Sequence, residues 1–190
     1  AATEIAKKGV DIRYQTDVVS IKQQGDEFIC CLKDSSQLVV DTVMYATGRQ
    51  ALTQDLGLDN VKVELRDNGT IVTDEHFMTK EPSIFALGDV IGTPELTPVA
   101  IEQAMVFVDQ QYGANTKTMS YEAIPTAIFC QPNIGTVGLS EEQCKQRQLD
   151  AEVYLSEFKH LKHTLSGSDE RILMKMIVER ETQKVLGIHM

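Results

Sequence analysis

Apolar residues in this chain occur in short runs separated by polar, glycine-containing turns, a pattern that favours strands over long helices. In the first quarter of the chain, strands are predicted at residues 10–14, 17–22, 27–33, 38–40 and 43–46. The turns between them carry Gly25-Asp26 and Asp34-Ser35-Ser36, residue types that are typical of tight turns. The last run is apolar throughout and ends at Thr47-Gly48, so we expect a buried strand there.

The pattern changes near residues 112–120, where we place a domain boundary. After that boundary, strands are predicted at residues 126–129, 136–138, 152–159, 172–178 and 185–189. One helix interrupts them, because Ser140 and Gln143 have the spacing of a capping box. Several strands with one or two helices indicate an α+β layer that is distinct from the part before it.

The middle of the chain contains the pattern with the clearest chemical meaning. The apolar run 84–87 reaches a glycine and then Asp89, which predicts a buried strand that ends in a tight turn. A helix is predicted from Pro98 to about residue 111, with Thr97 as its N-cap. This arrangement places a carboxylate at the carboxyl end of a strand, facing the positive end of a helix. Open α/β sheets bind cofactors in such a crevice.

Composition and charge narrow the classes of protein further. The chain carries a formal net charge of −10 and is 42% hydrophobic, which indicates a folded globular protein without the clustered basic face of a nucleic-acid binder. No apolar run is long enough to span a bilayer, and the start shows no secretory signal. We therefore expect a cytoplasmic protein with no membrane or nucleic-acid partner. The chain begins without methionine, so we expect a piece of a longer protein.

The cysteines and histidines predict neither a redox pair nor a metal site. Neither CxxC nor CxxxxC occurs among Cys30, Cys31, Cys130 and Cys144, so we expect four reduced, mostly structural thiols. The side chains of the first two should point to opposite faces of a strand, because they are adjacent. The four histidines lack zinc-ligand spacing, and His189 fits a structural strand position.

Further motifs flank the aspartate turn in a specific order. The sequence Tyr45-Ala46-Thr47-Gly48-Arg49 precedes it, and Leu96-Thr97-Pro98 follows it closely. Downstream, residues 124–129 read Ile-Pro-Thr-Ala-Ile-Phe and residues 134–139 read Ile-Gly-Thr-Val-Gly-Leu. In this order and spacing, these motifs resemble the glutathione reductase branch of the FAD-dependent pyridine nucleotide-disulfide oxidoreductases. The resemblance covers essentially the whole chain.

The resemblance implies three parts and a fold class. Residues 1–49 correspond to the back half of an NADPH-binding domain, and residues 50–117 to the second segment of an FAD-binding domain. Residues 118–190 correspond to the first part of an interface domain that forms a homodimer. The expected fold is therefore α/β plus α+β: partial Rossmann-like three-layer segments, followed by part of an α+β dimerisation domain.

The resemblance also assigns an FAD site. Asp89 corresponds to the aspartate that hydrogen-bonds the ribityl chain of the flavin. Leu96, Thr97 and Pro98 correspond to the helix start that points at the flavin pyrimidine edge. Free amides and the helix dipole would stabilise the negative charge of the reduced ring there by up to roughly 2 kcal/mol. The alternatives are an ordinary turn aspartate and an ordinary capped helix.

Three residues are assigned to NADP by the same resemblance. Gly48 corresponds to a close approach of the backbone to the nicotinamide nucleotide, and Ala127 to a backbone carbonyl beside the nicotinamide amide. Arg49 either contacts a cofactor phosphate or pairs with a nearby acid, and both alternatives stay open.

The function that the resemblance implies is the transfer of electrons from NADPH through FAD to glutathione disulfide. No catalytic residue is assigned, because the chain lacks the family's GxGxxG loop and CxxxxC cysteine pair. We therefore expect this chain alone to be inactive. Residues 162–167 look like those of bacterial glutathione reductases, whereas Met105 stands where animal-type enzymes place an arginine for the glutathione carboxylate.

Two alternatives to this function remain. A reductase of the same family could act on a trypanothione-like disulfide, dihydrolipoamide or mercuric ion. The chain could instead be a non-catalytic folded fragment that acts only as an assembly module.

Overall fold

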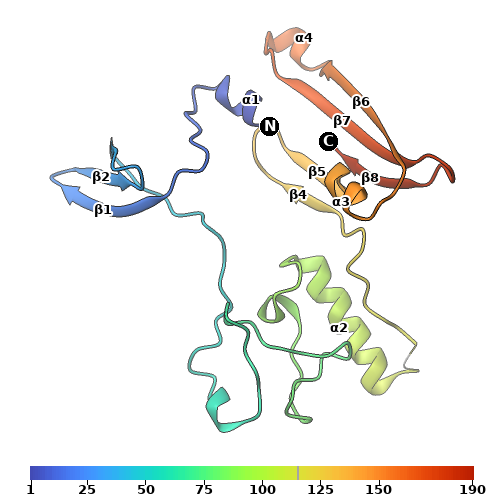
Figure 1. The fold of residues 1–190 in the computed structure, drawn as a ribbon. Helices are drawn as coiled ribbons and strands as arrows, with labels where there is room; N and C mark the ends of the chain where they lie inside the picture. The colour runs from blue at the N-terminus through green and yellow to red at the C-terminus, as the bar shows by residue number, and fades with distance from the viewer. Residues whose placement is uncertain (115) are drawn as a thin grey trace. The chain divides into compact units, whose positions relative to one another are not determined.

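The computed structural model describes residues 1–114 and 116–190. It divides the chain into two compact units, of which one combines Ala1–Thr47 with Pro125–Met190 and the other is Gly48–Ile124 (Figure 1). The first unit holds two antiparallel sheets, and the second holds the longest helix. This mixed α and β content agrees with the expected fold class. Within the described residues, no helix is both long enough and apolar enough to cross a membrane.

The smaller sheet confirms three of the five predicted early strands. Its elements, after the short helix α1 (Ala2–Ala6), are β1 (Val18–Gln24), β2 (Glu27–Leu32) and β3 (Gln37–Val40). They pair antiparallel in the order β1-β2-β3. Cys30 is buried in β2 and its neighbour Cys31 is half-buried, as expected for side chains on opposite faces. All four cysteines are free thiols.

The larger sheet has five antiparallel strands. The elements of this region are β4 (Thr126–Ile128), β5 (Ile134–Gly138), α3 (Glu141–Gln146), β6 (Ala151–Lys159), α4 (His163–Ser166), β7 (Arg171–Glu179) and β8 (Val185–His189). The strand order is β4-β5-β8-β7-β6, and each of the five strands lies where a short run was predicted to form one. The capping box of α3 is confirmed, since Ser140 Oγ accepts from the Gln143 N–H at 3.2 Å and Gln143 Oε1 accepts from the Ser140 N–H at 2.8 Å.

Two of the predicted early strands do not form. Residues 10–14 and 43–46 have irregular backbone, and Met44 and Tyr45 are 84% and 72% exposed. An apolar run becomes a buried strand only where a neighbouring strand accepts and donates its backbone hydrogen bonds. Within the described part of the chain, no strand pairs with either segment.

The second unit contains the short 3₁₀ helices η1 (Leu58–Asn60) and η2 (Gly88–Ile91), and the helix α2 (Thr97–Tyr112). Its core is formed by Ile71, Phe77, Ala86, Ile91 and Val106. The predicted strand at 84–87 is reduced to a single bridge between Phe85 and Met78. Residues 67–69 form a tight turn, which the antiparallel bridge between Leu65 and Ile71 closes.

The start of α2 differs from the prediction by one residue. Leu96, not Thr97, is the N-cap, and no side chain caps this end within the described residues. Leu96 has extended backbone, and its carbonyl accepts hydrogen bonds from the N–H groups of Val99 and Ala100 at 3.0 and 3.1 Å. The backbone geometry of an N-cap therefore exists here without the hydroxyl that usually accompanies it.

Strands β5 and β8 approach each other closely where Gly138 pairs with Gly187. A Cβ at Gly187 would lie 2.1 Å from the Leu139 carbonyl oxygen. We expect Gly187→Ala to lower the free energy of unfolding by about 1–3 kcal/mol, because the backbone must shift. Urea unfolding of the full gene product measures this. The control is Gly135→Ala on β5, where a Cβ would meet only Met190 Cγ at 3.5 Å; an equal loss in both variants would contradict the steric explanation.

The C-terminal end of α2 is tied to the following loop by Asp109. Its carboxylate accepts the backbone N–H groups of Thr116 and Lys117 at 2.8 and 2.9 Å, and these bonds hold the pKa of Asp109 below its ordinary value. A lowered pKa means that the stabilisation is complete above the ordinary value and is lost as the pH falls below about 4. We expect the amide NMR shifts of both donors to follow that titration, and Asp109→Asn to remove it. Acid-side shifts that persist unchanged in the variant would contradict this.

Candidate functional site

The turn that carries Asp89 is fixed from both sides by backbone contacts. Before it, the Ala86 N–H donates to the Phe77 carbonyl at 2.9 Å. After it, Ile91 is buried in the core and its carbonyl accepts from Arg66 Nη1 at 2.9 Å. Between them, η2 begins at Gly88, whose φ of +76° favours glycine. The exposed side chain of Asp89 is therefore carried by a well-anchored segment.

A cavity of about 400 Å³ lies between this turn and the start of α2. It is lined by Arg49, Asp89, Glu95, Thr97, Ala100, Ile101 and Ala104. Ala100 and Ala104 are four residues apart on α2, so they lie on one face of the helix and leave room beside it. A cavity with an apolar wall and a few convergent polar groups is typical of a site for a small molecule or a cofactor.

Arg49 and Asp89 form an ion pair at this cavity. Arg49 Nη1 lies 3.8 Å from Asp89 Oδ2, and the two side chains are 71% and 51% exposed. A long, exposed pair of this kind contributes little to stability. The carboxylate and the guanidinium are thus both available to a ligand.

The start of α2 offers an amide donor to the same cavity. Val99 and Ala100 donate to the Leu96 carbonyl, and Pro98 has no N–H. Thr97 lines the cavity, and within the described part of the chain its backbone N–H has no acceptor, so this amide can bind a ligand at the helix end. The absence of a side-chain cap within the described residues keeps that end open.

The structure brings together some of the predicted site residues and not others. Asp89, Thr97 and Arg49 line one cavity, and Leu96 and Pro98 flank Thr97 along the chain. Gly48 precedes Arg49 with a φ of +118°, and a Cβ there would meet no atom within 4 Å. Its need for glycine is therefore conformational within the described structure. Ala127 belongs to the other unit, on β4, where it pairs with Gly135.

Sequence reasoning missed Gln103, which is fully buried in α2. Its Oε1 accepts the Gly88 N–H at 2.6 Å, and its Nε2 donates to Thr93 Oγ1 and to the Tyr121 hydroxyl, both at 2.9 Å. The available signal was a polar residue among the inward-facing positions of an otherwise apolar helix face, next to Val99 and Val106, which are also buried. Ala100 and Ala104 were also missed, because small residues carry no chemical signal of their own.

His189 has the structural role that the sequence predicted. Its Nε2 lies 3.0 Å from the Leu139 carbonyl oxygen, and its Nδ1 contacts Thr136 Oγ1. The carbonyl can only accept, so Nε2 carries the hydrogen and Nδ1 accepts from the hydroxyl. Both ring nitrogens are thereby engaged within the sheet.

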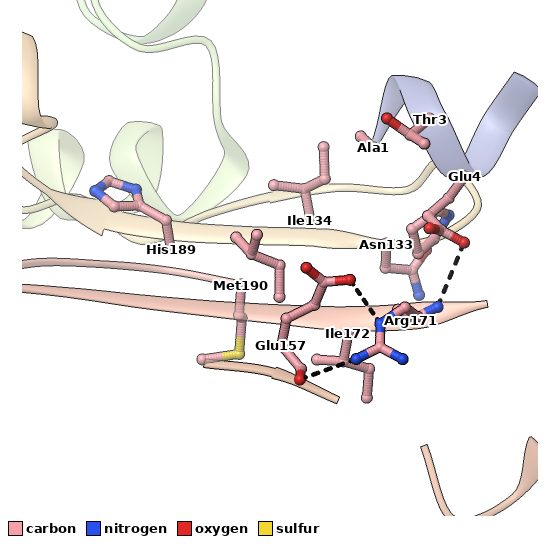
Figure 2. A pocket seen from close by; sticks show the side chains of 12 residues that line it. Ala1, Thr3, Glu4, Asn133, Ile134, Glu157, Arg171, Ile172, His189 and Met190 are labelled. Carbon is pink, nitrogen blue, oxygen red and sulfur yellow. Dashed lines mark hydrogen bonds and ion pairs between the residues drawn. The ribbon is translucent and has the colours of Figure 1, made fainter. Parts of the chain in front are cut away.

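A second cavity, of about 390 Å³, lies between α1 and residues of β5, β6, β7 and β8 in the larger sheet (Figure 2). Arg171 Nε donates to Glu157 Oε1 at 2.6 Å, and the Arg171 backbone N–H donates to Glu4 Oε2 at 3.3 Å. The pKa of Glu4 lies below its ordinary value, chiefly because Lys7 donates a hydrogen bond to it. The charged groups of this cavity thus hold α1 to β7, which makes it a structural junction.

Two protein families match parts of this chain. Residues 1–104 match the family described as pyridine nucleotide-disulphide oxidoreductase. Residues 124–190 match the dimerisation domain of pyridine nucleotide-disulphide oxidoreductases.

Individual relatives agree with these matches. A glutathione reductase of Burkholderia cepacia is 40% identical over 98% of this chain and 41% of that protein. A chloroplastic/mitochondrial glutathione reductase of Pisum sativum is 43% identical over 78% of this chain and 27% of that protein. A trypanothione reductase of Trypanosoma congolense (34% identical, 98% of this chain, 38% of that protein) and a soluble pyridine nucleotide transhydrogenase of Photorhabdus laumondii (33%, 95%, 39%) are similar as well.

A solved structure is similar over the whole chain. It is a Cu(II) complex of the HOCl-induced flavoprotein disulfide reductase RclA from Escherichia coli, with a TM-score of 0.89 and 27% sequence identity. The match covers 100% of this chain and 43% of that one. The chain therefore spans less than half the length of the known proteins that it resembles.

Proposed function

This chain belongs to the pyridine nucleotide-disulphide oxidoreductase family, and from that premise we propose that it is part of a flavoprotein that passes electrons from NADPH through FAD to glutathione disulfide. The observation that carries the proposal is the cavity shared by Asp89 and the uncapped start of α2. One side supplies a carboxylate acceptor and the other an amide donor. A flavin nucleotide presents hydroxyls to the first and a ring that gains negative charge to the second.

The residues present fit FAD in chemistry and in space. Asp89, whose side chain is half-exposed, offers a carboxylate that accepts strong hydrogen bonds from the hydroxyls of a ribityl chain. The Thr97 amide and the helix dipole stabilise negative charge at the pyrimidine edge of the ring. The small side chains of Ala100 and Ala104 leave room against α2. Bound FAD would supply the redox chemistry, by taking the hydride of NADPH and passing its electrons toward a disulfide.

The remaining site residues are proposed for the nucleotides. Arg49 holds a nucleotide phosphate, because its planar guanidinium matches phosphate oxygens and its pairing with Asp89 is weak enough to be exchanged. Gly48, with its positive φ, shapes the backbone that carries Arg49. Ala127 offers a backbone carbonyl to the nicotinamide amide of NADP. Leu96 and Pro98 fix the direction of the helix start.

Glutathione disulfide is the proposed substrate of the whole enzyme. The glutathione reductases of Burkholderia cepacia and Pisum sativum support it through their identity of 40% and 43%. Trypanothione reductase and pyridine nucleotide transhydrogenase are also among the relatives, so those two activities are the alternatives. Met105 is half-exposed on α2, and its thioether cannot bind a substrate carboxylate as an arginine would.

The larger sheet is proposed to form part of a homodimer interface, because residues 124–190 match a dimerisation domain. The proposed place of the enzyme is the cytoplasm. A non-catalytic assembly module is the second candidate function, and it rests on the same dimerisation match.

The full gene product tests these proposals directly. A purified protein with a flavin absorbance spectrum that oxidises NADPH in the presence of glutathione disulfide supports the proposed function. Turnover only with trypanothione disulfide, or hydride transfer between NADPH and NAD⁺, would replace it with one of the alternatives. A colourless, inactive and dimeric protein would favour the assembly module.

Asp89→Ala tests the flavin assignment. We expect it to weaken FAD binding by about tenfold to a hundredfold, since a hydrogen bond to a charged group contributes about 1.5–3 kcal/mol. Titration of the apoprotein with FAD, followed by flavin fluorescence, measures the change. The control is Glu102→Gln on the exposed side of α2, which removes a carboxylate outside the cavity and should leave the affinity unaltered. Equal effects of the two substitutions would contradict the assignment.

A further inference from the structure

Gln103 connects the wall of the cavity to the turn that carries Asp89. We propose that Gln103 is a positioning residue, which holds the Gly88–Asp89 turn against α2 and so sets the position of the Asp89 carboxylate relative to the flavin. This inference rests on the proposed function, because it concerns the same site. Gln103 itself is fully buried and does not line the cavity, so its role is exerted through the turn.

The first contact is the hydrogen bond from the Gly88 N–H to Gln103 Oε1, at 2.6 Å. Gly88 directly precedes Asp89, so this bond fixes the backbone from which the carboxylate projects. The turn and the helix are also in van der Waals range, since a Cβ at Gly88 would lie 3.6 Å from Ala100 Cβ. The Asp89 side chain pairs with Arg49 only across 3.8 Å at the surface, which is too weak to fix it.

The other end of the Gln103 amide prevents the side chain from turning. Both hydrogens of Nε2 are used, one by Thr93 Oγ1 and one by the Tyr121 hydroxyl, each at 2.9 Å. An inverted amide would place an N–H group against the Gly88 N–H, where two donors would face each other. The network therefore admits a single orientation, with Oε1 toward the turn.

The position of Gln103 on α2 explains how this helix both lines the cavity and holds the Gly88–Asp89 turn. Ala100, three residues before it, and Ala104, directly after it, line the cavity, while Gln103 lies behind them and reaches the turn. Loss of its amide would leave the Gly88 N–H without its acceptor in a partly buried place. Such a group is costly, so the turn would move toward water or toward another acceptor.

Two substitutions test the proposal in the full gene product reconstituted with FAD. Gln103→Leu removes all three hydrogen bonds and keeps a similar volume. We expect the FAD dissociation constant to rise about tenfold and the midpoint potential of the bound flavin to shift. Tyr121→Phe removes only one acceptor of the Gln103 amide, and we expect a rise of about threefold with a smaller potential shift in the same direction.

The matched control is Gln110→Leu, two turns further along the same helix. Gln110 donates from Nε2 to the Lys117 carbonyl at 3.3 Å, so its loss removes a helix-to-loop hydrogen bond that is remote from Gly88. We expect this variant to change the thermal unfolding midpoint but neither the FAD affinity nor the flavin potential.

The outcomes separate this inference from the proposed function. A parent protein that binds no FAD refutes the proposed function itself. A parent that binds FAD, with Gln103→Leu destabilised but unaltered in affinity and potential, overturns the positioning role and leaves the proposed function standing. If Gln103→Leu does not fold, Tyr121→Phe decides: an unaltered affinity overturns the proposal and the expected rise supports it.

Discussion

The candidate site depends on how closely the turn at Gly88 packs on α2. Glycine at this position allows the positive φ, and Gln103 supplies the acceptor for its N–H. Both features keep the turn against α2, where Asp89 and Thr97 line one cavity. Ile91 of η2 and Val106 of α2 are fully or nearly fully buried in the same hydrophobic core, which also holds the turn against the helix. The packing of the turn on α2, and not the ion pair between charged groups, thus shapes the site.

Local sequence predicted the parts of the fold that local interactions determine. The five strands of the larger sheet followed from short runs separated by turns, and the capping box of α3 from a spacing of three residues. The prediction of a strand at 43–46 was wrong, because the apolar character of a segment does not show whether a neighbouring strand is present to pair with it. The N-cap of α2 was predicted one residue too late, at Thr97 instead of Leu96, because Leu96 takes the N-cap backbone geometry without a side-chain acceptor.

In the candidate site, too, local sequence identified some residues, whereas others depend on the folded chain. Asp89 and Thr97 were identified by short motifs, and the structure places both on one cavity. Gln103 could not be found in this way, because its function depends on three partners at residues 88, 93 and 121 that only the folded chain brings together. Ala127 would act through its backbone, and a backbone carbonyl leaves no trace in the residue type.

The discontinuity of the first unit has a consequence for synthesis on the ribosome. Residues 48–124 form one compact unit from a continuous segment, so the partners of its internal contacts are all translated close together. The contacts between α1 and the later part of the first unit form only afterwards: Lys7 donates to the Asp169 carbonyl and Glu4 accepts from the Arg171 N–H. Docking of α1 beside β7 therefore follows the translation of the whole second unit, so the two parts of the first unit are joined late in synthesis.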